Sequence, residues 1–276
     1  MTLRRIALPL AGAGMALFGA AAAVGKPKPS APVSSAEQAQ LREIARRGAL
    51  IYAYDQAAWH GTDDMVAKLP DYQERVGGWI VDGPAEAPEL IFFDKAGVRP
   101  VYAARFRDGR LVSGEIAGSD AGELSATRRR LIVARKAALV ALEASDSRGC
   151  SEAPMNSVVL PPTSPGEPTL VYVLTPQRVM DAFPFGGHFL VPVDSSGRAG
   201  PIRRFTKTCV EISLADADKG KKLAALGIMH LLDPVPTEVH VFTSLAARMP
   251  VTVGTNDGRT WWVDGTAIRL IGKDGR

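Results

Sequence analysis

The sequence lacks the short motifs that accompany the common catalytic sites. It contains no G-x-S-x-G, S-x-x-K or H-E-x-x-H pattern, no G-x-x-x-x-G-K loop and no G-x-G-x-x-G turn. These patterns mark acyl transfer, zinc-dependent hydrolysis, phosphate binding and dinucleotide binding. No local motif therefore indicates one of these reactions, and a catalytic site would have to be assembled from residues far apart in the sequence.

A large excess of charge of either sign is also missing. The 276 residues include 33 Lys and Arg against 29 Asp and Glu, and the net charge falls from +4 to +2 without Arg4 and Arg5. The densest basic group, Arg128-Arg129-Arg130 with Arg135-Lys136, lies in a predicted helix whose other side is apolar, so we expect a solvated face. Nucleic-acid-binding proteins usually concentrate basic residues on one surface. We predict no nucleic-acid partner and no cofactor.

Long uncharged apolar stretches are absent outside the N-terminus. There, Arg4 and Arg5 precede the apolar segment 6–17, and small residues then offer cleavage sites, the last of which ends at Ala23. This order is typical of a secretory signal. An uncleaved membrane anchor is the alternative, because the uncharged run nearly reaches the roughly 20 apolar residues that span a bilayer. Its second half is mostly Ala and Gly, so we predict that residues 1–23 are a cleaved signal peptide.

Amino-acid usage points to a bacterial source. Arg outnumbers Lys 23 to 10 and Ala is abundant, as in proteins from GC-rich bacterial genomes. An exported bacterial protein is periplasmic or secreted, and this one would touch the membrane only through an uncleaved signal. Residues 24–34 are rich in proline and predict an extended linker.

Cysteine is scarce, and Cys150 and Cys209 are the only two in the chain. An even number of cysteines in an exported protein indicates a disulfide. In the chain-entropy model, closing this loop stabilises the fold by about 4 kcal/mol. A reactive thiol is the alternative, but neither cysteine belongs to a C-x-x-C pair. We predict the disulfide.

The remaining sequence predicts an α+β fold, and residues 35–147 form its helix–meander–helix region. A capping box at Ser34 starts a helical pattern, which Gly61 is expected to end, so that Asp63 and Asp64 open a second short helix. A further, longer helix is expected over 121–144, capped by Ser119 or Asp120. The strands between the helices are expected at 78–81, 89–93, 100–106 and 111–116.

Residues 148–276 predict a larger antiparallel β-rich region. Strand–helix–strand alternation is not evident, which argues against a parallel sheet. One helix is expected over 215–226. Trp261 and Trp262 would place one indole on each face of a strand, one in the core and the other available for stacking. The expected strands are 157–160, 169–174, 189–193, 202–212, 239–242, 251–255, 261–263 and 267–271.

Histidines of the second region are candidates for a metal or catalytic site. His188 follows two glycines, and Glu238 and His240 would share one face if 238–242 were a strand. Neighbouring strands could bring His188 or His230 alongside, which would give a zinc-like set of ligands. Structurally hydrogen-bonded histidines are the alternative, and we favour it because no diagnostic spacing is present. We therefore predict no metal.

Asp55 is a second candidate. It lies on the same helical stripe as Ile51, Tyr52 and Trp59, so we expect its carboxyl group to be half-buried. Burial would raise the pKa of this group and allow it to act as a general acid. A structural hydrogen bond is the alternative.

Two classes of function follow. The favoured one is a non-enzymatic binding or envelope-associated module outside the cytoplasm, based on the export signal, the near-neutral charge and the missing catalytic motifs. The alternative is a small exported hydrolase or metal-dependent enzyme that uses His188, His230, His240 and Glu238. The convergence of these four side chains on a pocket would distinguish the two classes.

Overall fold

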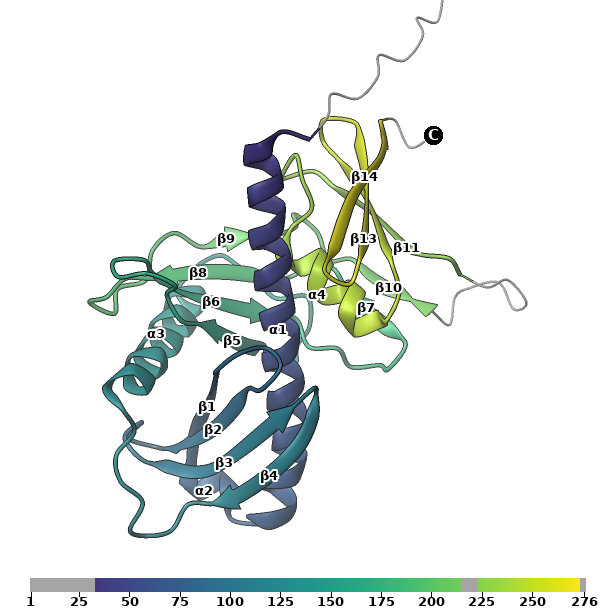
Figure 1. Cartoon of the computed structure of the whole chain (residues 1–276). Coiled ribbons are helices and arrows are strands. Elements are labelled where there is room, and N and C mark those ends of the chain that lie inside the picture. Colours follow the sequence, from purple (N-terminus) through teal and green to yellow (C-terminus); the bar gives the residue numbers. More distant parts are fainter. Residues whose placement is uncertain (1–32, 215–222, 274–276) are drawn as a thin grey trace, which may run out of the picture.

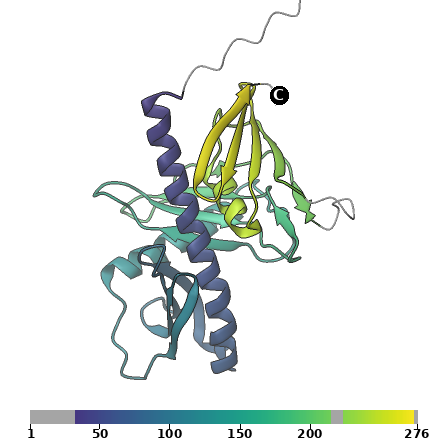
Figure 2. The same ribbon diagram turned by 45° about the vertical axis from the view of Figure 1, so that its right-hand side comes forward.

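The predicted α+β class is confirmed by the structure, a computed structural model that describes residues 33–214 and 223–273. The long helix α1 runs through the molecule, and separate sheets lie along its length (Figure 1). Figure 2 shows the C-terminal strands beside the first half of this helix. The predicted signal peptide, nearly all of the linker and most of the helix expected over 215–226 lie outside the described residues. Leu226, at the end of that expected helix, begins a strand instead.

Helix α1 (Ser35–Lys68) begins where the capping box predicts, because the Ser34 side chain accepts a hydrogen bond from the Glu37 backbone N–H at 3.2 Å. The expected break at Gly61 is wrong. A Cβ atom at Gly61 would overlap the Leu90 side chain, so glycine here permits close packing on the neighbouring sheet. Asp64 consequently lies near the end of the helix, where it pairs with Lys68 at 2.8 Å.

The first sheet is the predicted antiparallel meander. Its strands follow each other in sequence order, and the short helix α2 (Tyr72–Arg75) connects α1 to it. Asp108 and Gly109 both have positive φ values, 50° and 73°, as a tight hairpin requires. The strands are β1 (Val76–Asp82), β2 (Glu89–Asp94), β3 (Pro100–Arg107) and β4 (Arg110–Ile116).

Helix α3 (Ala126–Glu143) starts later than expected. Ser125, and not Ser119 or Asp120, is its N-cap and accepts a hydrogen bond from the backbone of the first turn. The preceding segment is tied to the turn between β2 and β3, because the Leu124 N–H donates to the Val98 carbonyl group at 2.8 Å.

The solvated basic face expected on this helix is wrong for two of its arginines. Arg128 pairs with Asp82 at 2.8 Å and also with Glu89. Arg135 is half-buried, and its Nε donates to Ser157 Oγ at 2.8 Å. These two side chains tie α3 to the sheets on which it packs.

The second sheet is antiparallel and lies between α1 and α3. Its strands are β5 (Asn156–Leu160), β6 (Thr169–Leu174), β8 (Phe189–Val193) and β9 (Arg203–Arg204). The strand expected over 202–212 is wrong as a single element. Its beginning is β9, and its end belongs to β10 (Glu211–Ser213), which pairs with β7 (Ala182–Pro184). The segment between them carries Cys209 and leaves the second sheet.

The third sheet contains the strand–helix–strand unit that was not expected. Strands β11 (Leu226–His230) and β12 (Val251–Thr255) are parallel, and helix α4 (Glu238–Ala247) connects them. Antiparallel β13 (Arg259–Asp264) and β14 (Ala267–Lys273) complete the sheet.

The strand expected over 239–242 is therefore wrong. Its β-branched and aromatic residues lie in the first turns of α4, where a cap outweighs their strand propensity. The Thr237 backbone N–H donates to His240 Nδ1 at 2.9 Å and closes a capping box.

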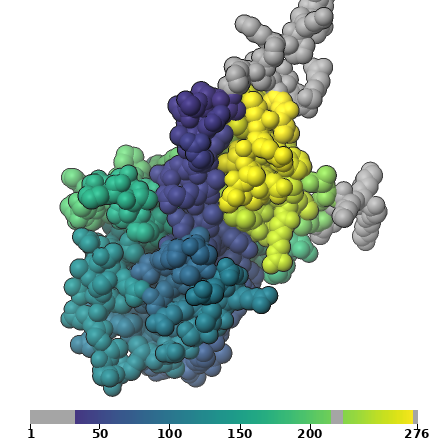
Figure 3. Space-filling view, in the orientation of Figure 1, coloured from purple at the N-terminus to yellow at the C-terminus, as the bar shows by residue number. Residues whose placement is uncertain are grey.

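Helix α1 is the element that the sheets share. Its second half packs on the first and second sheets through Ile51, Tyr54 and Met65, while Leu41 and Ile44 pack on the third. Figure 3 shows α1 in purple between the blue-green first sheet and the yellow C-terminal strands. The middle of α1 therefore lies where all these layers meet.

Candidate functional site

A cavity of about 700 Å³ lies beside the second half of α1. Its wall also includes β1, the ends of β5 and β6, β7 and α4. This volume is within the range found for small-molecule sites, and a largely apolar lining is also typical of them. Six aromatic side chains contribute to the wall: Trp59, Tyr72, Trp79, Phe92, Phe183 and Phe242.

The rim of the cavity carries exposed apolar side chains. Trp59 on α1 is 45% exposed, and Val179 and Met180 in the loop after β6 are 61% and 71% exposed. Large apolar groups at the opening of an apolar cavity are typical of an interaction site. The rim therefore extends the apolar surface that a bound molecule would meet.

Two buried polar atoms on the wall have no hydrogen-bond partner. They are Trp79 Nε1 and Thr243 Oγ1, and no other buried side-chain nitrogen or oxygen atom in the described part of the chain is unpaired. Leaving a buried polar atom unpaired costs about 1–3 kcal/mol, so such atoms are rare. Both residues line the same cavity.

Asp55 also lies on the wall and is half-buried, as predicted. Asn156 Nδ2 donates to its carboxylate at 3.3 Å, and Gln56 is the second hydrogen-bond partner. Burial raises the pKa of Asp55 to about 6, although these two partners lower it. The group is therefore mostly ionised at neutral pH, and its pKa is close enough to neutrality for proton transfer.

Arg135 lies behind the cavity wall. Its guanidinium group is 4.5 Å from the centre of the Trp79 ring. Burial lowers the pKa of Arg135 to about 10, so the group stays charged at neutral pH. No carboxylate pairs with it among the residues that the structure describes. The positive charge therefore stands next to the indole that has the unpaired N–H.

His188 lies outside the cavity and bridges two residues of its wall. Its Nδ1 accepts a hydrogen bond from the Thr175 backbone N–H at 3.2 Å, and its Nε2 lies 2.9 Å from the Pro184 carbonyl oxygen, to which it donates. Burial lowers the pKa of His188 to about 4 and keeps the ring neutral. Both ring nitrogens are occupied by the backbone, so this histidine holds the ends of β6 and β7 together.

The other two candidate histidines, His230 and His240, lie close to each other but outside the cavity. The His230 and His240 ring centres are 4.8 Å apart. His230 Nε2 is 2.8 Å from Asp233 Oδ2, and burial lowers the pKa of His240 to about 3. Glu238 accepts a hydrogen bond from the Tyr172 hydroxyl group at 2.7 Å.

These side chains do not form a set of metal ligands. No group of three or more His, Cys, Asp or Glu residues in the described ranges could hold a metal ion. None of His188, His230, His240 and Glu238 lines the large cavity. The shared strand face expected for Glu238 and His240 does not exist, because both residues lie in the first turn of α4.

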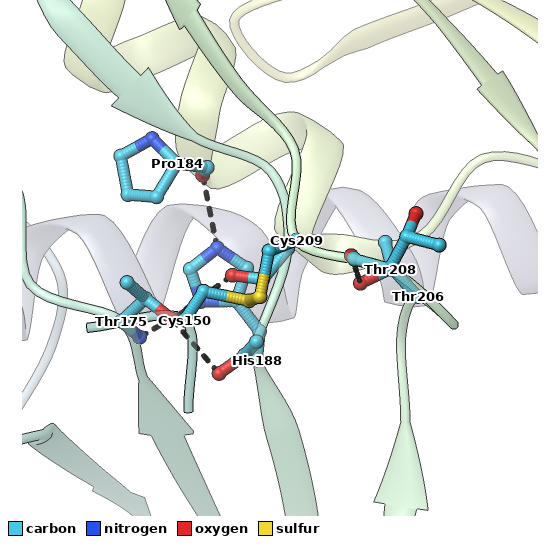
Figure 4. The surroundings of a disulfide bond; sticks show 9 residues. Cys150, Thr175, Pro184, His188, Thr206, Thr208 and Cys209 are labelled. Carbon is cyan, nitrogen blue, oxygen red and sulfur yellow. Dashed lines mark hydrogen bonds between the residues drawn. A yellow bond between two sulfur atoms is a disulfide. The ribbon is translucent and has the colours of Figure 1, made fainter. Parts of the chain in front are cut away.

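The predicted disulfide is confirmed. Cys150 and Cys209 are bonded, with a Cα–Cα distance of 5.3 Å. Figure 4 shows the bond beside His188 and its partners Thr175 and Pro184. At Gly187, where φ is 73°, a Cβ atom would lie 2.7 Å from Cys150 Sγ, so the disulfide needs glycine there. The bond thus supports the side of the cavity that β6 and β7 form.

Comparisons with protein-family models, curated proteins and solved structures give no match. In residues 33–214 and 223–273, no helix has the length and apolar character to cross a membrane. The functional argument therefore depends on the chemistry of the cavity. Sequence reasoning identified Asp55 by its helical stripe, but it missed Trp79 and Thr243, because the lack of a partner is a property of the folded chain.

Proposed function

We propose that the protein is an exported bacterial binding module and that its ligand occupies the cavity beside α1. The disulfide is compatible with folding in an oxidising compartment such as the periplasm. The basic, apolar and small residues at the N-terminus support export. The ligand class that fits the wall is a small, mostly apolar molecule with a few polar atoms.

The unpaired atoms Trp79 Nε1 and Thr243 Oγ1 carry this proposal. The indole N–H can only donate a hydrogen bond, whereas the hydroxyl group can donate or accept one. A molecule with an acceptor at Trp79 would remove the penalty of the unpaired donor. If the cavity had no unpaired polar atoms on its wall, it could be explained as a defect in packing and would give no reason to expect a ligand.

Binding is favoured over catalysis because the wall offers one acid–base group and no paired nucleophile. Asp55, Tyr72 and Arg178 are the ionisable residues on it, and Arg178 is exposed on the rim. The alternative of a hydrolase or metal-dependent enzyme built on the histidines gains no support from their hydrogen bonds with the backbone and with Asp233.

Titration with the neutral apolar fluorophore N-phenyl-1-naphthylamine tests the proposal. We expect saturable binding to the wild type and at least a tenfold loss of affinity in Ala246→Trp, which fills the cavity from α4. Ala39→Trp is the matched control, because Ala39 is exposed on α1 away from the cavity. Thermal melting checks that both variants fold. Absence of saturable binding, or an equal loss in both variants, would refute the proposal.

A further inference from the structure

Among the described residues, Asp55 is the only one that brings a carboxyl group to the cavity wall, and it has no cationic partner there. Its hydrogen bonds come from the neutral amide groups of Asn156 and Gln56. No Lys, Arg or His in the described ranges forms an ion pair with it. A carboxylate removed from water is unfavourable unless a positive charge or several donors compensate it. The cavity therefore presents a negative charge that lacks a counter-ion.

The aromatic lining is suited to the same kind of charge. The faces of Trp, Tyr and Phe rings carry negative electrostatic potential and attract organic cations. Six aromatic residues line this cavity, and Trp59 extends the aromatic surface to the opening. A simple metal ion would gain little from such a lining, whereas the apolar body of an organic cation would pack against its rings.

We propose that the ligand is an organic cation with an apolar body, an amine or quaternary ammonium compound, whose positive charge pairs with Asp55. This inference rests on the proposed binding function and specifies the ligand class of the same cavity. The unpaired Thr243 hydroxyl group, in a residue that is 2% exposed, offers a further polar contact on the α4 side.

Arg135 sets the orientation of this ligand. Its positive charge over the Trp79 ring repels a cation from that indole, and it also makes the indole N–H a stronger hydrogen-bond donor. The cationic end therefore faces Asp55, and an uncharged acceptor such as a carbonyl or ether oxygen faces Trp79 Nε1. Asp55 and Trp79 thus recognise different parts of one molecule.

The charge of Asp55 makes binding of a permanent cation depend on pH. With the pKa of the empty site near 6, about a tenth of the carboxyl groups are ionised at pH 5 and nearly all at pH 8. The affinity for a permanent cation should therefore be about tenfold lower at pH 5 than at pH 8. Tyr72 and Arg178 also line the cavity, and Arg135 lies behind its wall. His60 is stacked on Trp59 at the opening, with ring centres 5.3 Å apart.

Displacement of the bound neutral fluorophore tests the proposal. The probes are decyltrimethylammonium, decanol and decanesulfonate, which share one chain and differ in charge, each used below its micelle concentration. In the wild type we expect the cation to compete at a concentration at least tenfold lower than the alcohol, and the anion to be weakest. In Asp55→Asn the ratio between cation and alcohol should fall to about one.

The ratio is taken within each protein, so that a general change in binding cancels. If Asp55→Asn does not fold, the pH series on the wild type decides, with His60→Gln as the control that should keep the same pH dependence. Equal competition by cation and alcohol in the wild type, or a pH-independent cation affinity, would overturn the cation proposal and leave the binding proposal standing. Failure of the fluorophore to bind at all would refute both.

Discussion

Two groups of buried polar side chains differ in how their hydrogen bonds are completed. His188 has a partner for both ring nitrogens, and Thr175 Oγ1 donates to the Gly186 carbonyl group at 2.9 Å. On the cavity wall, Trp79 Nε1 and Thr243 Oγ1 have none. The first group therefore stabilises the fold, while the second is the one to which our proposal assigns a partner from outside the chain.

Removal of a partnered side chain should have the largest effect. His188→Ala would leave the Thr175 N–H and the Pro184 carbonyl group buried and unpaired, and it would also leave a void. We expect the free energy of unfolding to fall by about 3 kcal/mol. Urea denaturation followed by circular dichroism measures this change. A loss below about 0.5 kcal/mol would show that the two hydrogen bonds are unimportant and would remove the contrast between the groups.

Acid should reduce the contribution of His188 to the free energy of unfolding. The pKa of His188 is about 4 in the folded protein and about 6.5 in an unfolded chain, so the unfolded state binds more protons as the pH falls. The stability advantage of the wild type over His188→Ala should therefore shrink by about 2 kcal/mol between pH 7 and pH 5. Asp55, whose pKa is raised, acts in the opposite direction in both proteins and cancels. A pH-independent difference between the two proteins would contradict this assignment.

Substitution of the unpaired hydroxyl group should have the smallest effect. Thr243→Val keeps the shape of the side chain and removes an atom without a partner, so the free energy of unfolding should stay the same or rise by up to about 1 kcal/mol. Thr175→Val is the matched control and should lower it by about 1–2 kcal/mol, because two backbone carbonyl groups lose a donor. The same urea titration compares them, and equal losses would show that Thr243 has a partner after all.

Much of the fold could be predicted from local patterns. The strands at 89–93, 100–106 and 169–174 were found because β-branched and aromatic residues stand between clear turn signals. The segment 239–242 has the same composition, but it follows Thr237 in the sequence, and this residue caps the start of a helix. Gly61 looked like a helix end, and only the position of Leu90 explains it. Both errors arise where a contact outweighs composition.

The candidate site could be predicted only in part. Asp55 was found because its place on an apolar stripe implies burial, and the disulfide because an exported chain with two cysteines favours it. Trp79 and Thr243 stand out through the absence of neighbours, which depends on residues from β1, β5 and α4 meeting in space. The prediction that Arg135 is solvated was wrong for the same reason, because the Trp79 indole that covers it belongs to a strand far away in the sequence.

The position of α1 also determines when this protein can fold. Leu41 and Ile44, near its beginning, are covered by Val251, Trp261 and Val263 of the last strands. Contacts that join the two ends of a chain close late, because the loop between them must be ordered first. Helix α1 therefore keeps an uncovered apolar side until the last strands are in place. Under the export that we propose, the chain would stay unfolded until its last strands have crossed the membrane, and the cavity would form only there.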